Sequence, residues 1–354
     1  MTKWHIAHLA CIAAVIGVGL GAAPSAVAHE RTHVVFPGES IQKTVDAARP
    51  GDTVLLASGT FHESVTVSTP GLTLRGMGRG TVIRPAAKKA ADSCAKSGNG
   101  ICVVGKKGRH VKGVSVAGLT VTGFAGSGVF AESTDGLTVR HVTAVKNGVW
   151  GIAQERSVRG VFRQNTARHN GDAGLFLANT IKAEEGAADT KGTVVAHNLL
   201  EGNRIGVTVR RLRNLTVADN LVTGNCAGVF VVGDENKPRA GALTVSDNRI
   251  ERNNKSCPKT ARLDALQGTG IVLTGTEDTL VTRNLIRENT GNSPLSGGIV
   301  VWKSFVGTTS ERNRITGNVL EGNGPADLVN TDTAGKGNTF QGNACRASKP
   351  AGLC

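Results

Sequence analysis

The stretch NLLEGNRIGVTVRRLRNLTVADNLVTGN, residues 198–225, shows the repeating unit of this chain with the fewest interruptions. Each unit holds a short apolar strand, an Asn, a second strand, another Asn five residues on, and a third strand that begins after a Gly. The Asn pair recurs at 165/170, 198/203, 220/225, 248/253, 284/289, 318/323 and 338/343, with Val142 and Asn147 as a degenerate earlier copy. Short strands repeating about every 22 residues predict a solenoid.

The strands are rich in Val, Leu, Ile and Thr, and no helix-length pattern separates them. This composition predicts an all-β fold with three parallel strands per turn of a β-helix, in about ten coils. The recurring Asn residues are expected to form the corners, since Asn tolerates the left-handed backbone conformation. Their stacked side chains should also hydrogen-bond as a ladder along the solenoid. The first corner of a coil is expected at Asn198, Asn220, Asn248 and Asn284.

The repeat resembles that of the secreted right-handed parallel β-helix proteins of the pectate-lyase-like superfamily, which includes pectinesterase-like proteins and polysaccharide epimerases. The segment SIQKTVDAARPGDTVLLASGTFHESVTV, residues 40–67, looks like the first coil of such proteins. It is most similar to that of the periplasmic copper-maturation β-helix proteins of nitrous oxide reduction. The resemblance implies a right-handed parallel β-helix. It does not specify an activity, because such folds host many chemistries and also non-catalytic binders.

Residues 1–28 have the features of a signal peptide, with Lys3 ahead of an apolar run and small residues before His29. We therefore expect a secreted, extracellular and monomeric protein without a membrane span, in which residues 29–354 form one β-helix domain. Ile41 and Val45 share one face of a helix expected over residues 40–49. This helix should cap the open first coil.

Six cysteines follow the signal peptide, and none of their spacings matches a zinc site. Proximity in sequence and coil register favour three disulfides, which agree with export. The expected pairs are Cys94–Cys102, Cys226–Cys257 and Cys345–Cys354. The last pair would pin a tail, residues 344–354, that shows no strand pattern.

The chain carries a formal net charge of +14, but only 3% of its residues are aromatic and none is Tyr. Basic surfaces that bind nucleic acid usually interleave with stacking aromatic side chains. We therefore expect an acidic polysaccharide or cell-wall polymer as the partner and no nucleic acid. Plain solubility is the alternative explanation of the charge.

Alternate residues of the third strand should point inward, because side chains alternate along a strand. This places Val129, Ile152, Leu175, Val207, Val229, Ile271 and Ile299 in the core. One outward column then holds Phe130, Ala153, Phe176, Thr208, Phe230, Val272 and Val300, and a second holds Glu132, Glu155, Ala178, Arg210, Val232, Thr274 and Trp302. Inserts on both sides of this strand predict a substrate trough, or alternatively a cover over an apolar strip.

Elimination or epimerisation of a uronic acid requires positive charge near the carboxylate and a base for the adjacent proton. We assign catalytic roles to Lys303 or Arg210, as the base, and to Glu155; a tyrosine base is excluded because the chain has no Tyr. Substrate binding is assigned to Glu132, Arg156, Phe176, Arg211, Phe230, Asp234 and Trp302. Glycoside hydrolysis by Glu132 and Glu155, about 5 Å apart on neighbouring coils, is a second possibility. Non-catalytic polysaccharide binding is the alternative to both.

No cofactor and no metal are expected, and calcium is the alternative. Asp234 and Asp278 place carboxylates on neighbouring outer corners, where loops could hold a hard cation. Lys237 and Arg239 favour a salt-bridged loop there instead. The resemblance to copper-maturation proteins also raises a copper site at His29, which becomes N-terminal after cleavage, with His33 nearby.

Overall fold

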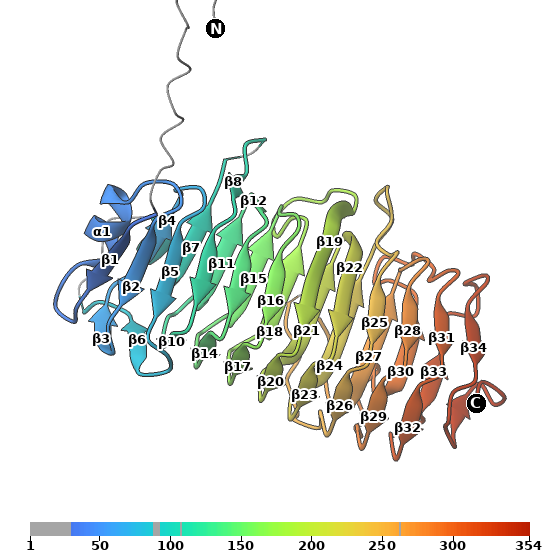
Figure 1. Ribbon diagram of the computed structural model, residues 1–354. Helices are drawn as coiled ribbons and strands as arrows, with labels where there is room; N and C mark the ends of the chain where they lie inside the picture. Colours follow the sequence, from blue (N-terminus) through green and yellow to red (C-terminus); the bar gives the residue numbers. More distant parts are fainter. Residues whose placement is uncertain (1–29, 88–92, 107, 262) are drawn as a thin grey trace, which may run out of the picture. The chain divides into compact units, whose positions relative to one another are not determined.

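The computed structural model describes residues 30–87, 93–106, 108–261 and 263–354, so the expected signal peptide lies outside the described residues. Residues Arg31–Cys354 form one compact unit. Its strands make three long sheets, A, B and C, and every ladder between named strands is parallel. Figure 1 shows the strands of successive coils stacked side by side, as the repeat predicted.

Sheet A contains, in spatial order, β1 (Thr32–Val35), β2 (Thr53–Leu56), β5 (Thr73–Gly76), β9 (Ser115–Ala117), β13 (Thr138–Arg140), β16 (Val161–Arg163), β19 (Ala188–Ala196), β22 (Leu212–Ala218), β25 (Thr244–Ser246), β28 (Leu280–Thr282), β31 (Arg314–Thr316) and β34 (Thr339–Gln341). Sheet B contains β3 (Gly59–His62), β6 (Thr81–Arg84), β10 (Thr120–Thr122), β14 (Thr143–Val145), β17 (Thr166–Arg168), β20 (Leu199–Glu201), β23 (Leu221–Thr223), β26 (Arg249–Glu251), β29 (Leu285–Arg287) and β32 (Val319–Glu321).

Sheet C contains β4 (Val65–Val67), β7 (Ile101–Val104), β11 (Val129–Glu132), β15 (Ile152–Glu155), β18 (Ala173–Ala178), β21 (Ile205–Arg210), β24 (Ala227–Val232), β27 (Thr269–Thr274), β30 (Gly297–Trp302), β33 (Leu328–Asn330) and β35 (Ser348–Lys349). A two-stranded sheet pairs β8 (Val111–Lys112) with β12 (Thr134–Asp135), and the helices are α1 (Ile41–Ala47) and α2 (Ser93–Lys96). Each regular coil therefore passes through A, B and C in turn, and ten to twelve strands per sheet agree with about ten coils.

One apolar core runs through the inside of all three sheets. The residues predicted to point inward from sheet C are fully buried: Val129, Ile152, Leu175, Val207, Val229, Ile271 and Ile299. A Gly precedes each of these residues because a larger residue would clash there. A Cβ at Gly206, for example, would lie 2.3 Å from Val222 Cγ1 and 2.7 Å from the carbonyl oxygen of Gly228. Only Gly lets the chain pass this close to the neighbouring sheet and coil.

The Asn residues form two continuous ladders, as predicted. One joins Asn165, Asn198, Asn220, Asn248, Asn284, Asn318 and Asn343, and the other joins Asn147, Asn170, Asn203, Asn225, Asn253, Asn289 and Asn323. Asn220 is typical: its Nδ2 donates to Asn248 Oδ1 at 2.9 Å and to the Val195 carbonyl at 3.0 Å. Its Oδ1 accepts from the backbone and side-chain amides of Asn198. The ladder therefore pairs backbone groups that the corners would otherwise leave unsatisfied inside the solenoid.

The prediction that the Asn residues themselves take the left-handed conformation is wrong. The residue before each first-corner Asn does so, with φ of 56° at His197, 56° at Asp219, 58° at Asp247 and 53° at Arg283. The reason is that the two residues at the corner have different roles. The Asn side chain must remain buried to form the ladder, so the strained backbone falls on its neighbour, whose side chain points away from the core.

Two further differences occur at the C-terminal end. Asn343, the second Asn of the pair 338/343, should by its position continue the second ladder by stacking on Asn323. It stacks instead on Asn318 and so continues the first ladder. Asp327 Oδ1 closes the second ladder by accepting from Asn323. The tail, predicted to lack strands, contains β35, which pairs with β33.

The predicted helix is present as α1 and packs against β1, β2 and β4, with Ile41 and Val45 buried. Ser40 caps its first turn by accepting from the backbone N–H of Lys43. All three predicted disulfides are formed: Cys94–Cys102, Cys226–Cys257 and Cys345–Cys354.

Replacing one rung of a ladder should be costly. Asn220→Ala removes the side-chain partner of the Val195 carbonyl and of the Asn198 amides inside the core, so we expect a loss of about 3 kcal/mol in the free energy of unfolding. Urea denaturation measures this loss. The control Gln341→Ala removes an exposed amide and should change stability by less than about 0.5 kcal/mol. Equal effects of the two substitutions would contradict a stabilising ladder.

A second prediction concerns Glu251, a buried carboxylate on sheet B. Arg249 Nε, Arg252 Nη2 and Arg287 Nη2 donate to it at 2.7, 2.9 and 3.1 Å. These bonds, Arg249 first, lower the pKa of Glu251 from 4.5 to about 2. Because the folded pKa is lowered, the stabilisation is complete above pH 4.5 and is lost as pH falls towards about 2.

Glu251→Gln should therefore lower the free energy of unfolding by about 1–2 kcal/mol at pH 7, allowing for solvent around the arginines. Chemical denaturation across this pH range should show the difference from the native protein shrinking between pH 4.5 and pH 2. Glu321→Gln, an exposed Glu in the same column with no ion pair in the described part of the chain, is the matched control. A pH-independent loss would mean that the ion pairs are not its cause.

Candidate functional site

The outer face of sheet C carries the residues predicted to form a site. Its strand register aligns Phe130, Ala153, Phe176, Thr208, Phe230, Val272 and Val300 in one column. It aligns Glu132, Glu155, Ala178, Arg210, Val232, Thr274 and Trp302 in the next. Both columns are those predicted from the alternation of side chains.

Most of this face is not open to a ligand. Phe230, Val272 and Val300 are at most 1% exposed, and Phe176 is 7% exposed. They form an apolar cluster, separate from the main core, with loop residues that include Leu266 and Leu295. From β18 to β30 the inserts therefore cover an apolar strip, which was the alternative explanation for them, instead of lining an open trough. Covering this strip removes apolar surface from water and so stabilises the fold.

The structure does not bring the three proposed catalytic residues together. Glu155 and Arg210 lie two strands apart, and Lys303, which follows β30, lies three strands beyond Arg210. At a strand spacing of about 4.8 Å these separations are about 10 and 14 Å, too large for action on one sugar ring. Arg210 Nη1 instead donates to the carbonyls of Thr180 and Ile181 at 3.4 and 3.1 Å.

Arg211 and Asp234, both proposed to bind substrate, form an ion pair with each other. The Arg211 side chain is only 5% exposed and also donates to the Ala183 carbonyl at 2.9 Å and pairs with Glu184 at 3.1 Å. The pair thus links two loops that flank sheet C. Trp302 lies at the end of β30 and is partly exposed.

The open part of the face lies over β11 and β15. Phe130, Glu132 and Trp150 are partly exposed there, and Glu132 is register-paired with Glu155 on the same face. Arg156 follows directly: its Nη1 is 3.8 Å from Glu132 Oε1, and its Nη2 is 3.6 Å from Glu185 Oε1. We call this group of four residues, Phe130, Glu132, Glu155 and Arg156, the Glu132–Glu155 site.

The two carboxyl groups of this site have different surroundings. Glu155 is 9% exposed, and burial raises its pKa, with the charge of Glu132 adding to the effect. A hydrogen bond from the Ile181 amide at 2.9 Å and the charge of Arg156 act in the opposite direction. The Glu132 side chain is 37% exposed. Glu155 therefore keeps its proton to a higher pH than an ordinary glutamate, a pattern typical of acid and base pairs.

The sequence did not reveal a second polar group at the amino ends of the same strands. Trp150 Nε1 donates to Asp172 Oδ2 at 2.9 Å, and its ring stacks on Phe176 with centroids 4.2 Å apart. Burial raises the pKa of Asp172, while its hydrogen bond from Trp150 and the charge of Arg204 lower it.

Arg204 is buried and donates to the carbonyls of Pro258 at 2.7 Å and Asp264 at 3.1 Å, so it holds the loop after Cys257 against sheet C. A signal for this group was present in the sequence. Asp172 and Arg204 both stand two residues before the Gly of their strands, in consecutive coils, which places opposite charges on neighbouring rungs.

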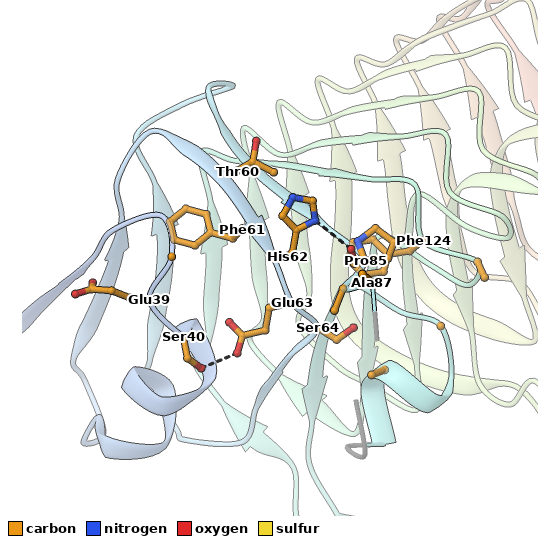
Figure 2. Close-up of a pocket in the computed structure, with 15 residues that line it drawn as sticks. Glu39, Ser40, Thr60, Phe61, His62, Glu63, Ser64, Pro85, Ala87 and Phe124 are labelled. Atoms are coloured by element: carbon orange, nitrogen blue, oxygen red, sulfur yellow. Dashed lines mark hydrogen bonds between the residues drawn. The ribbon is translucent and has the colours of Figure 1, made fainter. Parts of the chain in front are cut away.

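A cavity of the described residues lies elsewhere, beside α1. It has a volume of about 770 Å³ and is lined by residues beside α1, including Ser40, His62 and Glu63 (Figure 2). Of the two carboxylates that line it, Glu39 and Glu63, Glu63 accepts from Ser40 Oγ and from the backbone amide of Ile41, both at 2.7 Å. His62 Nδ1 lies 3.2 Å from the Pro85 carbonyl. Because Glu63 is committed to the first turn of α1, we place the candidate site on sheet C instead.

The expected calcium ligands are engaged in ion pairs. Asp234 pairs with Arg211, and Arg312 pairs with Asp278 at 2.8 Å. Of the possible copper ligands, His29 lies outside the described residues, and His33 Nε2 is 2.9 Å from Asp52 Oδ2. Within residues 30–87, 93–106, 108–261 and 263–354, no three His, Cys, Asp or Glu side chains cluster as metal ligands would. The residues described thus do not fit a copper centre.

The fold defines the class: the chain is a right-handed parallel β-helix protein. The model of the right handed beta helix region matches residues 88–240, and that of the periplasmic copper-binding protein NosD matches residues 178–349. The resemblance stated from the sequence is confirmed. The NosD match nevertheless lies outside residues 40–67, the segment on which the likeness to copper-maturation proteins was based. No curated protein matches the chain in sequence.

Solved structures with the same fold are distant in sequence. The A-module of the mannuronan C-5 epimerase AlgE4 of Azotobacter vinelandii is 17% identical, with a TM-score of 0.57 over 89% of this chain and 95% of that one. DFA-IIIase from Arthrobacter chlorophenolicus A6, in complex with GF2, is 14% identical, with a TM-score of 0.60 over 83% and 77%. The Dettilon tailspike protein is 13% identical, with a TM-score of 0.55 over 88% and 66%. At these identities the likeness is one of fold.

None of the helices in the described residues is long and apolar enough to cross a membrane. The three disulfides are of the kind that persists in oxidising compartments such as the periplasm or the cell exterior.

The raised pKa of Glu155 predicts an unusual pH dependence of stability. A glutamate whose folded pKa is raised stabilises the protein while protonated, and this contribution is lost as pH rises from 4.5 through the folded value. Glu155→Gln keeps an oxygen for the Ile181 amide but cannot ionise. Thermal melts should therefore show that the melting temperature of the variant, relative to that of the native protein, rises between pH 4 and pH 8. A constant difference over this range, or a gain for the control Glu201→Gln, would contradict the assignment.

Proposed function

We propose that this protein is exported and acts on an acidic polysaccharide at the Glu132–Glu155 site. The observation that carries the proposal is the pair of carboxyl groups on neighbouring strands, one half-exposed and the other buried with a raised pKa. Three disulfides and the partial match to a periplasmic protein family support export. The similarly folded mannuronan epimerase, a polysaccharide enzyme, supports the substrate class.

The surroundings of the pair suit a uronic acid. Arg156 is partly exposed, and its ion-pair distances of 3.6 and 3.8 Å are longer than hydrogen bonds, so its guanidinium can turn towards a substrate carboxylate. Lys182, whose charge acts on Glu155, is exposed nearby. Phe130, on the same face as Glu132 and two residues before it in β11, offers an apolar ring face, as sugar-binding surfaces commonly do.

The chemistry favoured by this geometry is β-elimination. Glu132, as base, removes the proton next to the substrate carboxylate, whose charge Arg156 neutralises; the electron pair forms a carbon–carbon double bond as the glycosidic C–O bond breaks. Glu155 gives its proton to the departing oxygen. Both carboxyl groups approach the ring from the same side, which suits elimination. Epimerisation requires a proton to leave one face and another to arrive on the opposite face.

Non-catalytic binding of the same polymer is the second candidate. It is favoured by the network that already engages the site, since the Ile181 amide bonds to Glu155 and Arg156 lies between Glu132 and Glu185. Such a network can serve only to attach the loop after β18 to sheet C.

Activity on defined polymers tests the proposal. The purified protein should release unsaturated oligosaccharides, detected by ultraviolet absorbance, from alginate or polygalacturonate. Glu132→Gln and Glu155→Gln should each lower the rate about 100-fold or more, because each removes a proton-transfer group. Glu201→Gln, on sheet B, should leave it unchanged.

The alternative outcomes are distinct. New reducing ends without ultraviolet absorbance would indicate hydrolysis by the same pair. Saturable binding without any product would favour the non-catalytic role. Product formation that survives both substitutions would rule out this site.

A further inference from the structure

Sheet A carries a basic groove on a different flank of the same coils. It has a volume of about 550 Å³, and its lining includes Leu55, Arg75, Met77, Arg140 and His141. The strand register aligns Arg75, Ala117 and Arg140 in one outward column and continues it to Arg163 on the next strand. We call Arg75, Arg140 and Arg163, with His141 beside them, the arginine row.

The spacing within the row follows from the fold. Arg75 and Arg140 are two strands apart and Arg163 is one strand further, so their backbones lie about 10 and 5 Å apart along the solenoid. Ala117, on the rung between the first two arginines, is small, and Gly76 and Gly118 form the adjoining corner. A shallow gap thus separates the cationic side chains, with backbone as its floor.

These arginines differ from most others in the chain because they are not neutralised. Arg75, Arg140 and Arg163 are exposed, and within the described residues no carboxylate lies within ion-pair distance of them. In the C-terminal half, by contrast, Arg213, Arg283 and Arg312 all pair with carboxylates at 2.7–2.8 Å. In the following coils the same column holds Ala196, Ala218, Ser246, Thr282 and Thr316. The excess positive charge on this flank is therefore confined to a few coils.

We propose that the arginine row is a second, non-catalytic binding site for an acidic polysaccharide, whose chain lies along the solenoid axis across the strands. A regular row of unpaired guanidinium groups matches a polymer that carries one acidic group per sugar, because both repeat at intervals of a few ångströms. Guanidinium forks bind carboxylate and sulfate oxygens bidentately. The site shares its ligand class with the proposed function but does not depend on catalysis at sheet C.

The flank fits this ligand better than nucleic acid or a membrane. The residues that line the groove include no Phe, Tyr or Trp side chain on which bases could stack. Met77, 64% exposed, is its one strongly exposed apolar side chain, too little to insert into lipid.

Binding of alginate and polygalacturonate oligosaccharides, measured by calorimetry over a range of salt concentrations, tests the proposal. The triple variant Arg75→Ala, Arg140→Ala, Arg163→Ala should bind about tenfold more weakly, with a smaller salt dependence, because three exposed charge contacts are lost. Thermal melting should confirm that it remains folded. Its rate of product formation on short oligosaccharides should equal that of the native protein, which separates this test from that of the Glu132–Glu155 site.

A matched control removes the same net charge elsewhere. Lys43, Lys336 and Lys349 are exposed, and their triple replacement by Ala should leave the affinity within about twofold. Equal weakening by both triple variants would mean a non-specific charge effect and would overturn the proposal. Tighter binding of a DNA oligonucleotide or of phosphatidylglycerol vesicles than of either polysaccharide, lost in the arginine variant, would also overturn it.

Discussion

The parallel pairing of equivalent strands, held in step by the Asn ladders, is the constraint on which the rest of the structure depends. Each amide fills the hydrogen-bonding positions of its own corner and of the coils on either side, so a coil cannot slip by one residue without breaking several buried bonds. Fixed register turns a one-dimensional repeat into columns of side chains about 4.8 Å apart. Ligand binding on this scaffold therefore depends on which columns remain exposed and on which charged columns lack an ion-pair partner.

Sheet C shows how a cover restricts a site. Its outward column is apolar almost throughout, and exposed strips of that kind are unfavourable in water. The inserts bury it from β18 onward, and Arg204, Arg210 and Arg211 fasten the inserts through carbonyl oxygens and carboxylates. The coils of β11 and β15, which precede the long inserts, keep Glu132 and Trp150 partly exposed. The location of the Glu132–Glu155 site thus follows from where the loops end.

The sequence predicted what is periodic and missed what depends on individual contacts. The coil order, the inward column from Val129 to Ile299, the ladders and the three disulfides all follow from spacing, since equivalent positions must stack. The left-handed corner residues were assigned one position too late, because intrinsic preference favours Asn while the ladder requires its side chain inside. Lys303 and Arg210, the two candidate bases, lie at the ends of strands three apart in sheet C, and spacing along the sequence does not reveal whether such residues can act together. Trp150 and Asp172 were overlooked because their partners come from different coils.

The partition of charge between the two halves of the solenoid has a physical consequence for any polyanion. In the C-terminal half, arginines such as Arg283 and Arg312 face carboxylates on neighbouring rungs, so their fields are largely cancelled within a few ångströms. No carboxylate among the described residues pairs with the arginine row, and the same coils carry the Glu132–Glu155 site on sheet C. An acidic chain approaching the protein is thus attracted most strongly to these coils. The arginine row on sheet A and the partly exposed carboxyl pair on sheet C lie in the same few coils. Both proposed functions are therefore located in one short section of the solenoid.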